Sequence, residues 1–189
     1  MSKGFTLVEL LIVIAILGVL SAAVVLVLNP AELLEQSRDS TRVSDLTTLN
    51  SALSLYLTDV TSPDMNGPLQ ANGECSSEQY VYADVTTNSF SVGLATESIS
   101  SSRLVDGGGW LPVNFTGISG GSPLGTLPAD PTNSGDLVYR YACDNTAKTY
   151  EVNAQFESDK YMTALDLDAK DGGNNATFYE VGNAPGLAL

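Results

Sequence analysis

The stretch that decides the fold is residues 4–28, which read GFTLVELLIVIAILGVLSAAVVLVL. From Leu10 to Leu28 the run is apolar and is broken only by Gly18 and Ser21. A helix needs about 20 apolar residues to cross the hydrocarbon core of a bilayer, so this run predicts a membrane-spanning helix. Its single carboxylate, Glu9, lies near the N-terminal end. A charge in such a segment is costly to insert, which marks Glu9 as a functional candidate.

The residues around Glu9 resemble the prepilin signal of type IV pilins and of type II secretion pseudopilins. The matching residues are Lys3, Gly4, Phe5, Thr6, Leu7, Val8 and Glu9, followed by the apolar run. The resemblance implies that a membrane peptidase cuts between Gly4 and Phe5, and that the new amino group of Phe5 is N-methylated. It also implies that Glu9 helps to dock each subunit into a growing filament, whose core is made of packed helices. Residues 1–4 would then be a leader peptide, and residues 5–28 both a transmembrane and a filament-core segment.

The spacing of Phe5 and Glu9 supports this interpretation on physical grounds. They are four residues apart, so on a helix they lie on one face. A free amino group at Phe5 would have a pKa of about 8 and would be cationic. That cation, from the same or a neighbouring subunit, would make the Glu9 carboxylate much cheaper in a low dielectric. Because the amine appears only after cleavage, we expect processing to control assembly.

Two simpler interpretations compete for the same segment. Ser21-Ala22-Ala23 is a passable exit for a secretory signal peptide, but the apolar run is too long for one and Glu9 interrupts it. An uncleaved signal anchor would need neither the Gly4-Phe5 junction nor Glu9. Lys3 before the run favours a cytoplasmic N-terminus and an exported body.

Composition narrows the function classes. The chain has 189 residues, a net charge of −14 and no histidine. Without histidine there is no Ser-His-Asp or Cys-His nucleophile, and most catalytic zinc sites are excluded. No nucleophile elbow, P-loop or dinucleotide loop appears, so we expect no enzyme. The acidic balance argues against nucleic-acid binding, unless the arginines cluster in space. These are Arg38, Arg42, Arg103 and Arg140.

Residues 29–59 predict an amphipathic continuation of the helix, interrupted or kinked at Asn29-Pro30 because proline removes a backbone hydrogen bond. Its apolar positions recur at helical spacing. They are Val43, Leu46, Leu49, Leu53 and Tyr56. Charged residues fall at neighbouring helical positions, Glu35 with Arg38 and Asp39 with Arg42.

Residues 60–189 predict one extracytoplasmic globular domain with long loops. Alternation over 137–143 and 149–156 predicts two strands with one buried and one wet face, joined by a turn at 144–148. A third strand is expected near 177–181, with a possible one at 79–85 and an ambiguous segment at 89–98. The sheet should pack on the apolar side of the helix. The expected fold class is α+β and pilin-like, a long N-terminal hydrophobic α-helix on a small antiparallel β-sheet.

Cys75 and Cys143 both lie in the exported part, where an oxidising compartment favours one disulfide. Two buried thiols are the alternative.

The segment 166–175 gathers oxygen-bearing side chains that suit calcium, with glycines for a sharp turn. The candidate ligands are Asp166, Asp168 and Asp171. The order Leu127-Pro128-Ala129-Asp130-Pro131, Tyr139-Arg140-Tyr141, then Asp171-Gly172-Gly173 resembles the C-terminal body of major pseudopilins, which hold calcium in a C-terminal loop. It is no EF-hand, because no glutamate closes it, and a solvated turn is the alternative. No cofactor is required on this interpretation, and calcium is a possible one.

The expected function is that of a structural subunit, a homopolymer built through the N-terminal helix into a type IV pilus or a type II secretion pseudopilus. Its partners would be a prepilin peptidase and N-methyltransferase, an inner-membrane assembly platform and the membrane, with no nucleic acid. Before assembly the chain would cross the inner (cytoplasmic) membrane once, with its N-terminus in the cytoplasm and its body outside. Assembly would place it in an extracellular pilus or a periplasmic pseudopilus. A DNA-uptake (competence) or adhesion module is the alternative, and a membrane-anchored enzyme is less favoured.

Overall fold

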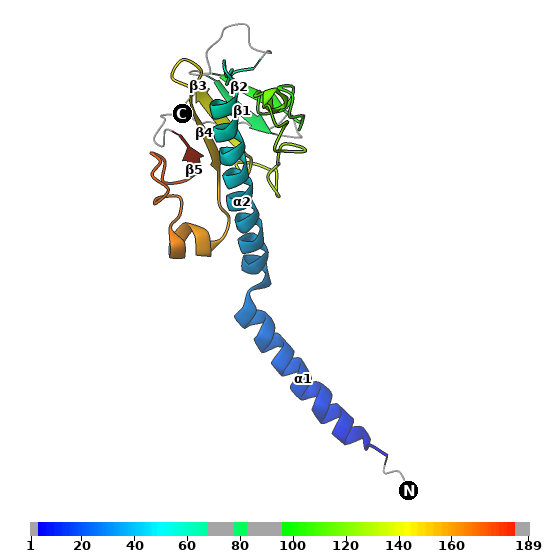
Figure 1. The fold of residues 1–189 in the computed structure, drawn as a ribbon. Helices are drawn as coiled ribbons and strands as arrows, with labels where there is room; N and C mark the ends of the chain where they lie inside the picture. The colour runs from blue at the N-terminus through cyan, green and yellow to red at the C-terminus, as the bar shows by residue number, and fades with distance from the viewer. Residues whose placement is uncertain (1–3, 68–77, 83–95, 184–189) are drawn as a thin grey trace.

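The computed structural model describes residues 4–67, 78–82 and 96–183, and shows a long helical stalk that carries a body on its C-terminal half (Figure 1). The stalk consists of α1 (Leu7–Leu28) and α2 (Pro30–Asp59). The body holds the strands β1 (Glu78–Tyr82), β2 (Thr96–Ser100), β3 (Arg140–Asp144), β4 (Thr149–Ala154) and β5 (Tyr179–Gly182). Two short helical turns, η2 (Phe115–Gly117) and η3 (Lys160–Leu165), lie in its loops.

The stalk breaks at a single residue, Asn29, where the sequence predicted a kink or break. Asn29 has φ 38° and ψ 76°, in the left-handed region, and serves as both the C-cap of α1 and the N-cap of α2. Asparagine tolerates this conformation better than most residues. Pro30 occupies the first position of α2, where its missing N–H would have no helical partner anyway. The proline therefore starts a second helix.

The sheet has the strand order β2-β1-β3-β4-β5. The pairs β1–β3, β3–β4 and β4–β5 are antiparallel, which confirms the expected α+β fold with its hairpin. The edge pair β1–β2 is parallel. The segment 89–98 is ambiguous from its sequence; β2 takes up its end from Thr96, and residues 89–95 lie outside the described residues.

The strand limits differ from the expected ones at one place that has a clear cause. The predicted strand 137–143 begins three residues later, at Arg140. Ser134 and Leu137 exchange backbone hydrogen bonds of 3.3 and 3.1 Å, so a tight turn takes up the start of the predicted segment.

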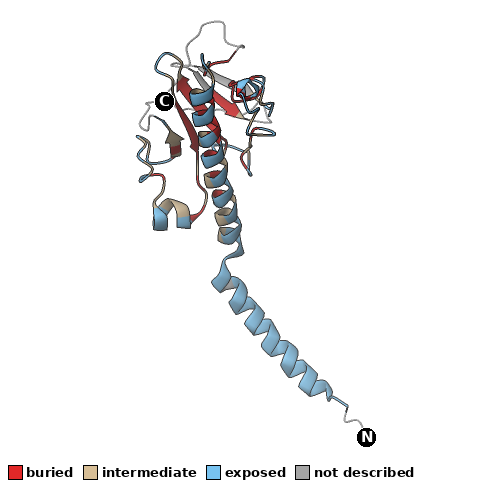
Figure 2. Ribbon diagram, viewed as in Figure 1, coloured by how far each residue is buried: buried red, intermediate tan, exposed pale blue. Residues whose placement is uncertain are grey.

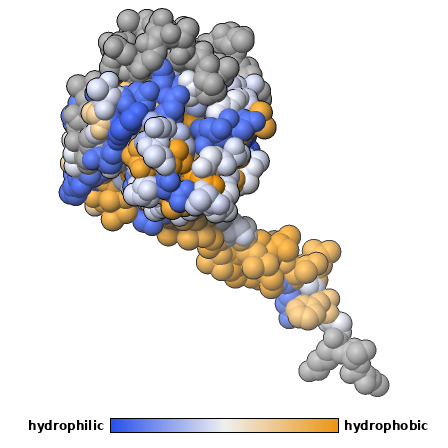
Figure 3. Space-filling model, turned by 45° about the horizontal axis from the view of Figure 1, so that its top comes forward, coloured by the Kyte–Doolittle hydropathy of each residue, from blue (hydrophilic) through white to orange (hydrophobic). Residues whose placement is uncertain are grey.

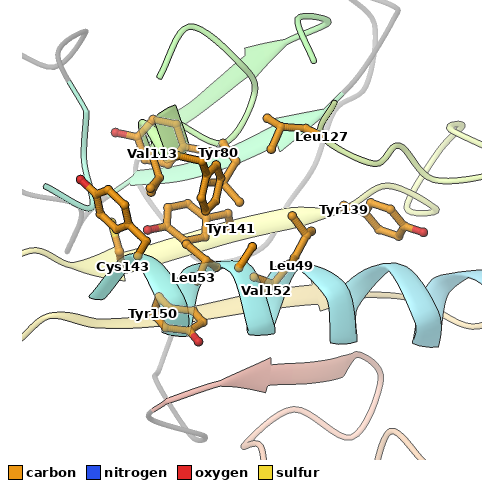
Figure 4. Packing of buried hydrophobic residues seen from close by; sticks show 14 of the residues in the cluster. Leu49, Leu53, Tyr80, Val113, Leu127, Tyr139, Tyr141, Cys143, Tyr150 and Val152 are labelled. Atoms are coloured by element: carbon orange, nitrogen blue, oxygen red, sulfur yellow. The ribbon is translucent and has the colours of Figure 1, made fainter. Parts of the chain in front are cut away.

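The core lies between α2 and one face of the β3–β4 hairpin (Figure 4). Leu46, Leu49 and Leu53 of α2 are fully buried, as are Tyr141 and Val152 of the strands. This arrangement follows from the two apolar periodicities, because neither face can be buried alone.

The other face of the hairpin is also buried, contrary to the expectation that it would be wet. Arg140, Glu151 and Asn153 point away from α2 along the strands and are 0–6 % exposed. The cause is the C-terminal segment, since the Phe178 ring lies 4.6 Å from the Arg140 guanidinium. The alternation of side chains predicted correctly which residues share each face of the sheet. It could not predict that a later loop would cover the face that points away from α2.

Candidate functional site: the N-terminal helix and the base of the body

The N-terminus of α1 is closed by a reciprocal pair of caps between Thr6 and Glu9. The Glu9 carboxylate accepts hydrogen bonds from the Thr6 backbone N–H at 2.8 Å and from the Thr6 hydroxyl at 2.7 Å. The Glu9 N–H donates back to the Thr6 hydroxyl oxygen at 3.2 Å. This capping box satisfies two backbone donors that a helix start leaves without partners. Phe5 precedes Thr6, whose backbone is extended, so Phe5 lies outside α1 and the expected helical pairing of Phe5 with Glu9 is not formed in the uncleaved chain.

The rest of α1 offers an apolar surface on every side. Its large side chains are 46–85 % exposed when Phe5 is included, and none belongs to the hydrophobic core (Figure 2). In Figure 3 the part of the stalk that extends from the polar body is mostly hydrophobic, with a hydrophilic patch near its N-terminal end. A helix that is hydrophobic all round is one that lies in a membrane or inside an assembly. Among the described residues, Leu7–Asp59 is the one stretch that is long and apolar enough to cross a membrane.

Residues 1–25 match the family model described as the prokaryotic N-terminal methylation motif. The chain carries a prepilin-type N-terminus. This motif is that of type IV pilin and pseudopilin precursors, and it implies processing by a prepilin peptidase and assembly at the membrane. It indicates a structural protein rather than an enzyme. No curated protein and no solved structure matches the chain.

The base of the body of this prepilin-type chain is held to α2 by a buried charge cluster centred on Arg42. The Arg42 guanidinium donates to Asp39 at 2.7 Å, to Asp130 at 2.6 and 2.8 Å and to Glu157 at 2.5 Å, and the side chains of Arg42, Asp39 and Asp130 are fully buried. Asp39 also accepts the backbone N–H groups of residues 157 and 158. The cluster therefore joins α2 to two loops that are distant in the sequence.

The electrostatics of this cluster keep Glu157 and Arg42 ionised. Burial would raise the pKa of Glu157, but hydrogen bonds from Arg38, Thr132 and Arg42 outweigh it and lower that pKa to about 2. Burial would likewise lower the pKa of Arg42, and its carboxylate partners instead hold it above its ordinary value. The spacing of Asp39 and Arg42 indicated one pair of this cluster. Nothing in the sequence pointed to Asp130 or Glu157.

The four arginines do not form a basic surface. Arg42 and Arg140 are buried, and Arg38 donates to Glu157 at 2.9 Å rather than pairing with Glu35. Arg103 donates to the backbone oxygen of residue 127. Binding to a DNA phosphate backbone requires cationic side chains that are exposed to solvent close to one another. These four arginines are not arranged in that way, so they do not form the cluster that DNA binding would need.

The three candidate calcium ligands lie on one loop but do not converge. Asp166 lies 3.4 Å from the ammonium of Lys170, and both oxygens of Asp171 accept backbone N–H groups, from Gly173 at 2.8 Å and Glu180 at 2.6 Å. Asp168 is buried, and one of its oxygens has no hydrogen-bond partner. Across the described residues, no three acidic, histidine or cysteine side chains gather closely enough to hold a metal ion. Calcium binding stays a prediction.

A buried acidic pair lies beside this loop. Glu151 on β4 is fully buried, and neither of its carboxylate oxygens has a hydrogen-bond partner among the described residues. Burial and the neighbouring Glu180 carboxyl raise the pKa of Glu151 to about 8. Sequence reasoning missed this pair, because a glutamate at an alternate strand position is normally a solvent-facing one.

Of the two cysteines, Cys143 lies in the core on β3, and Cys75 lies outside the described residues. The predicted disulfide therefore stays a prediction.

Proposed function

We propose that the chain is a structural subunit that loses residues 1–4 and polymerises through α1 into a filament of the type IV pilus or type II secretion pseudopilus class. The observation that carries the proposal is the contrast between the two halves of the stalk. The α2 helix buries one face against the sheet, whereas α1 leaves its apolar surface on every side without a partner in the body. A bilayer covers that surface before assembly, and the helices of neighbouring copies cover it afterwards.

Glu9 sets how far neighbouring α1 helices are shifted along one another in this packing. Inside a bundle of apolar helices its carboxylate needs a cation, and the amino group created at Phe5 supplies one. Among the described residues of the uncleaved chain, the Glu9 carboxylate accepts hydrogen bonds from Thr6. Cleavage between Gly4 and Phe5, followed by N-methylation of Phe5, creates a basic amine four residues before Glu9 in the sequence.

The first test is the intact mass and N-terminal peptide of the native protein from the membrane fraction. We expect an N-terminus at Phe5 that carries one added methyl group. A chain that still begins at Met1, or one cut near Ala23, would contradict the proposal and leave an anchored or secreted domain.

The second test separates processing from assembly. Glu9→Gln keeps the shape of the side chain and should be cleaved but fail to assemble, because the buried amine has lost its counter-charge. Glu35→Gln, which removes a carboxylate from α2 instead, is the matched control and should assemble normally. A Glu9→Gln chain that is cleaved and still assembles at the normal rate would refute the role of Glu9.

The kind of filament is settled by where the protein is found. Sheared extracellular fibres that contain the chain would indicate a surface pilus. Retention in the cell envelope, together with a block in secretion on deletion, would indicate a pseudopilus. A DNA-uptake or adhesion role would require the body to bind a ligand, and the buried positions of Arg42 and Arg140 make that role the weaker candidate.

A further inference from the structure

A short π-helical turn, η3, is fastened to the first turn of α2. Glu32, the third residue of α2, accepts the backbone N–H groups of Asp159 and Lys160 at 3.2 Å each. Two turns later, Asp39 accepts the N–H and the hydroxyl of Ser158 at 2.8 and 2.6 Å. The hydrogen bonds at Glu32 and at Asp39 therefore fix the position of η3 relative to the stalk. In Figure 1 it forms the edge of the body nearest to α1.

The length of α1 places this edge at a membrane surface. The 22 residues of α1 span about 33 Å at 1.5 Å per residue. The hydrocarbon core of a bilayer is about 30 Å thick, so in an anchored chain the whole length of α1 is needed to cross it. Asn29 then lies at the boundary, and Glu32 follows after less than one further turn. The start of η3, bonded to Glu32, has to lie in the headgroup region or directly above it.

The side chains at this edge suit that region. Leu33 and Leu34, in the first turns of α2, are 52 and 62 % exposed, and Leu165 at the end of η3 is 42 % exposed. Tyr161 is half-buried, with its ring 5.2 Å from that of Phe156. Tyrosine and long aliphatic side chains are enriched where a protein meets the membrane–water interface. These side chains give the base of the body exposed apolar groups close to the end of α1.

The charges of the same edge exclude one kind of lipid contact. Lys160 is balanced by Asp159 beside it, and Lys170 by Asp166. Glu32 and Glu35 add two further carboxylates. Because its positive charges do not exceed its negative ones, this edge has no net attraction for anionic lipids. Its contact with the membrane is therefore made by apolar and aromatic side chains among zwitterionic headgroups.

We propose that η3 and the first turns of α2 form a membrane-contact edge, which rests in the lipid headgroup region while the chain is anchored and unassembled. The inference rests on the membrane anchoring of α1 that the proposed function requires. It adds that the body leans on the bilayer at a defined place, so that leaving the membrane means breaking a second lipid contact besides that of α1.

The experiment uses the full chain, one copy for each nanodisc of phosphatidylcholine, so that a second copy cannot cover the edge. Tryptophan is introduced in single variants, and its fluorescence is quenched by lipids brominated near the glycerol backbone or, for the probe in the span, near the ends of the acyl chains. Leu165→Trp probes η3, Leu17→Trp probes the span, and Leu55→Trp probes an exposed site near the far end of α2. The wild-type chain, whose single Trp110 is buried in the body, supplies the background. Circular dichroism checks that each variant is folded.

We expect Leu165→Trp to be quenched at least about twofold more than Leu55→Trp, because interfacial segments bury their apolar faces in the acyl–headgroup boundary. Tyr161→Trp, an aromatic exchange that keeps the ring contact with Phe156, should behave like Leu165→Trp and serves if that variant does not fold. Quenching of Leu17→Trp without quenching of either η3 probe would overturn this inference and leave the anchoring intact. Absence of quenching at Leu17→Trp would overturn both.

Discussion

Replacing Arg42 by methionine should destabilise the body far more than the same change one turn earlier. Arg42 has no solvent exposure, and it is the shared partner of three carboxylates. Methionine fills most of the volume but leaves Asp39 and Asp130 buried without a cation. Removing one partner of a buried ion pair costs about 3–5 kcal/mol, a large fraction of the ~5–15 kcal/mol that holds a typical domain together.

The matched control is Arg38→Met on the same face of α2. The Arg38 side chain is 32 % exposed, and its ion pair is with Glu157. Partly exposed pairs of this kind contribute about 0–1 kcal/mol. The free energy of unfolding is measured by urea titration of the full chain in detergent, followed by the fluorescence of Trp110, which is 1 % exposed in the body.

The pH dependence of the two variants distinguishes this account from a simple loss of packing. In Arg42→Met the deficit should shrink as the pH falls, because a buried carboxylate that has lost its cation can take up a proton and become neutral. A packing defect would stay constant with pH. An Arg42→Met chain that loses no more free energy of unfolding than Arg38→Met would refute the reasoning.

Three further outcomes are expected. With a chelator present, the free energy of unfolding should be greatest near pH 4.5–5. The stabilising contribution of Glu157, whose pKa is about 2, is lost as the pH falls from 4.5 toward 2. The stabilising contribution of Glu151, whose pKa is about 8, is lost as the pH rises from 4.5 toward 8. A flat urea midpoint across pH 3–8 would contradict both assignments. Thiol labelling under denaturing conditions should find no free Cys75 or Cys143, and two labelled thiols would exclude the disulfide. Millimolar calcium should raise the melting temperature and Asp171→Asn should abolish the rise; an unchanged melting temperature would end the calcium prediction.

The sequence predicted the parts of this fold that depend on local periodicity. The apolar run and the spacing of Leu46, Leu49 and Leu53 indicated both halves of the stalk, and alternation in the hairpin indicated β3 and β4. Asn29-Pro30 marked the break because asparagine and proline act on the backbone of their own residues. The third predicted strand near 177–181 corresponds to β5.

What the sequence did not predict depends on contacts between distant segments. Arg42 meets Asp130 and Glu157 across 88 and 115 residues, and neither partner lies in a periodic element that would have indicated its position. The burial of Glu151 is missed for the same reason, since it is caused by a covering loop rather than by the strand that carries it. The β2 strand pairs in parallel with β1, and a parallel pairing leaves no hairpin signal between the two segments.

The single left-handed residue between the two helices gives the molecule the mechanics of a lever. Beyond Asn29, the 30 residues of α2 form an arm of about 45 Å. A rotation of about 10° about the backbone bonds of Asn29 would therefore swing the far end of the arm by about 8 Å. Because the body packs against α2 and stiffens it, the displacement reaches the outermost loops without being reduced. A change of one residue's torsion angles is enough to redirect the whole outer surface, and Asn29→Gly, which widens the allowed range of those angles, would make this junction more flexible without changing a residue inside either helix.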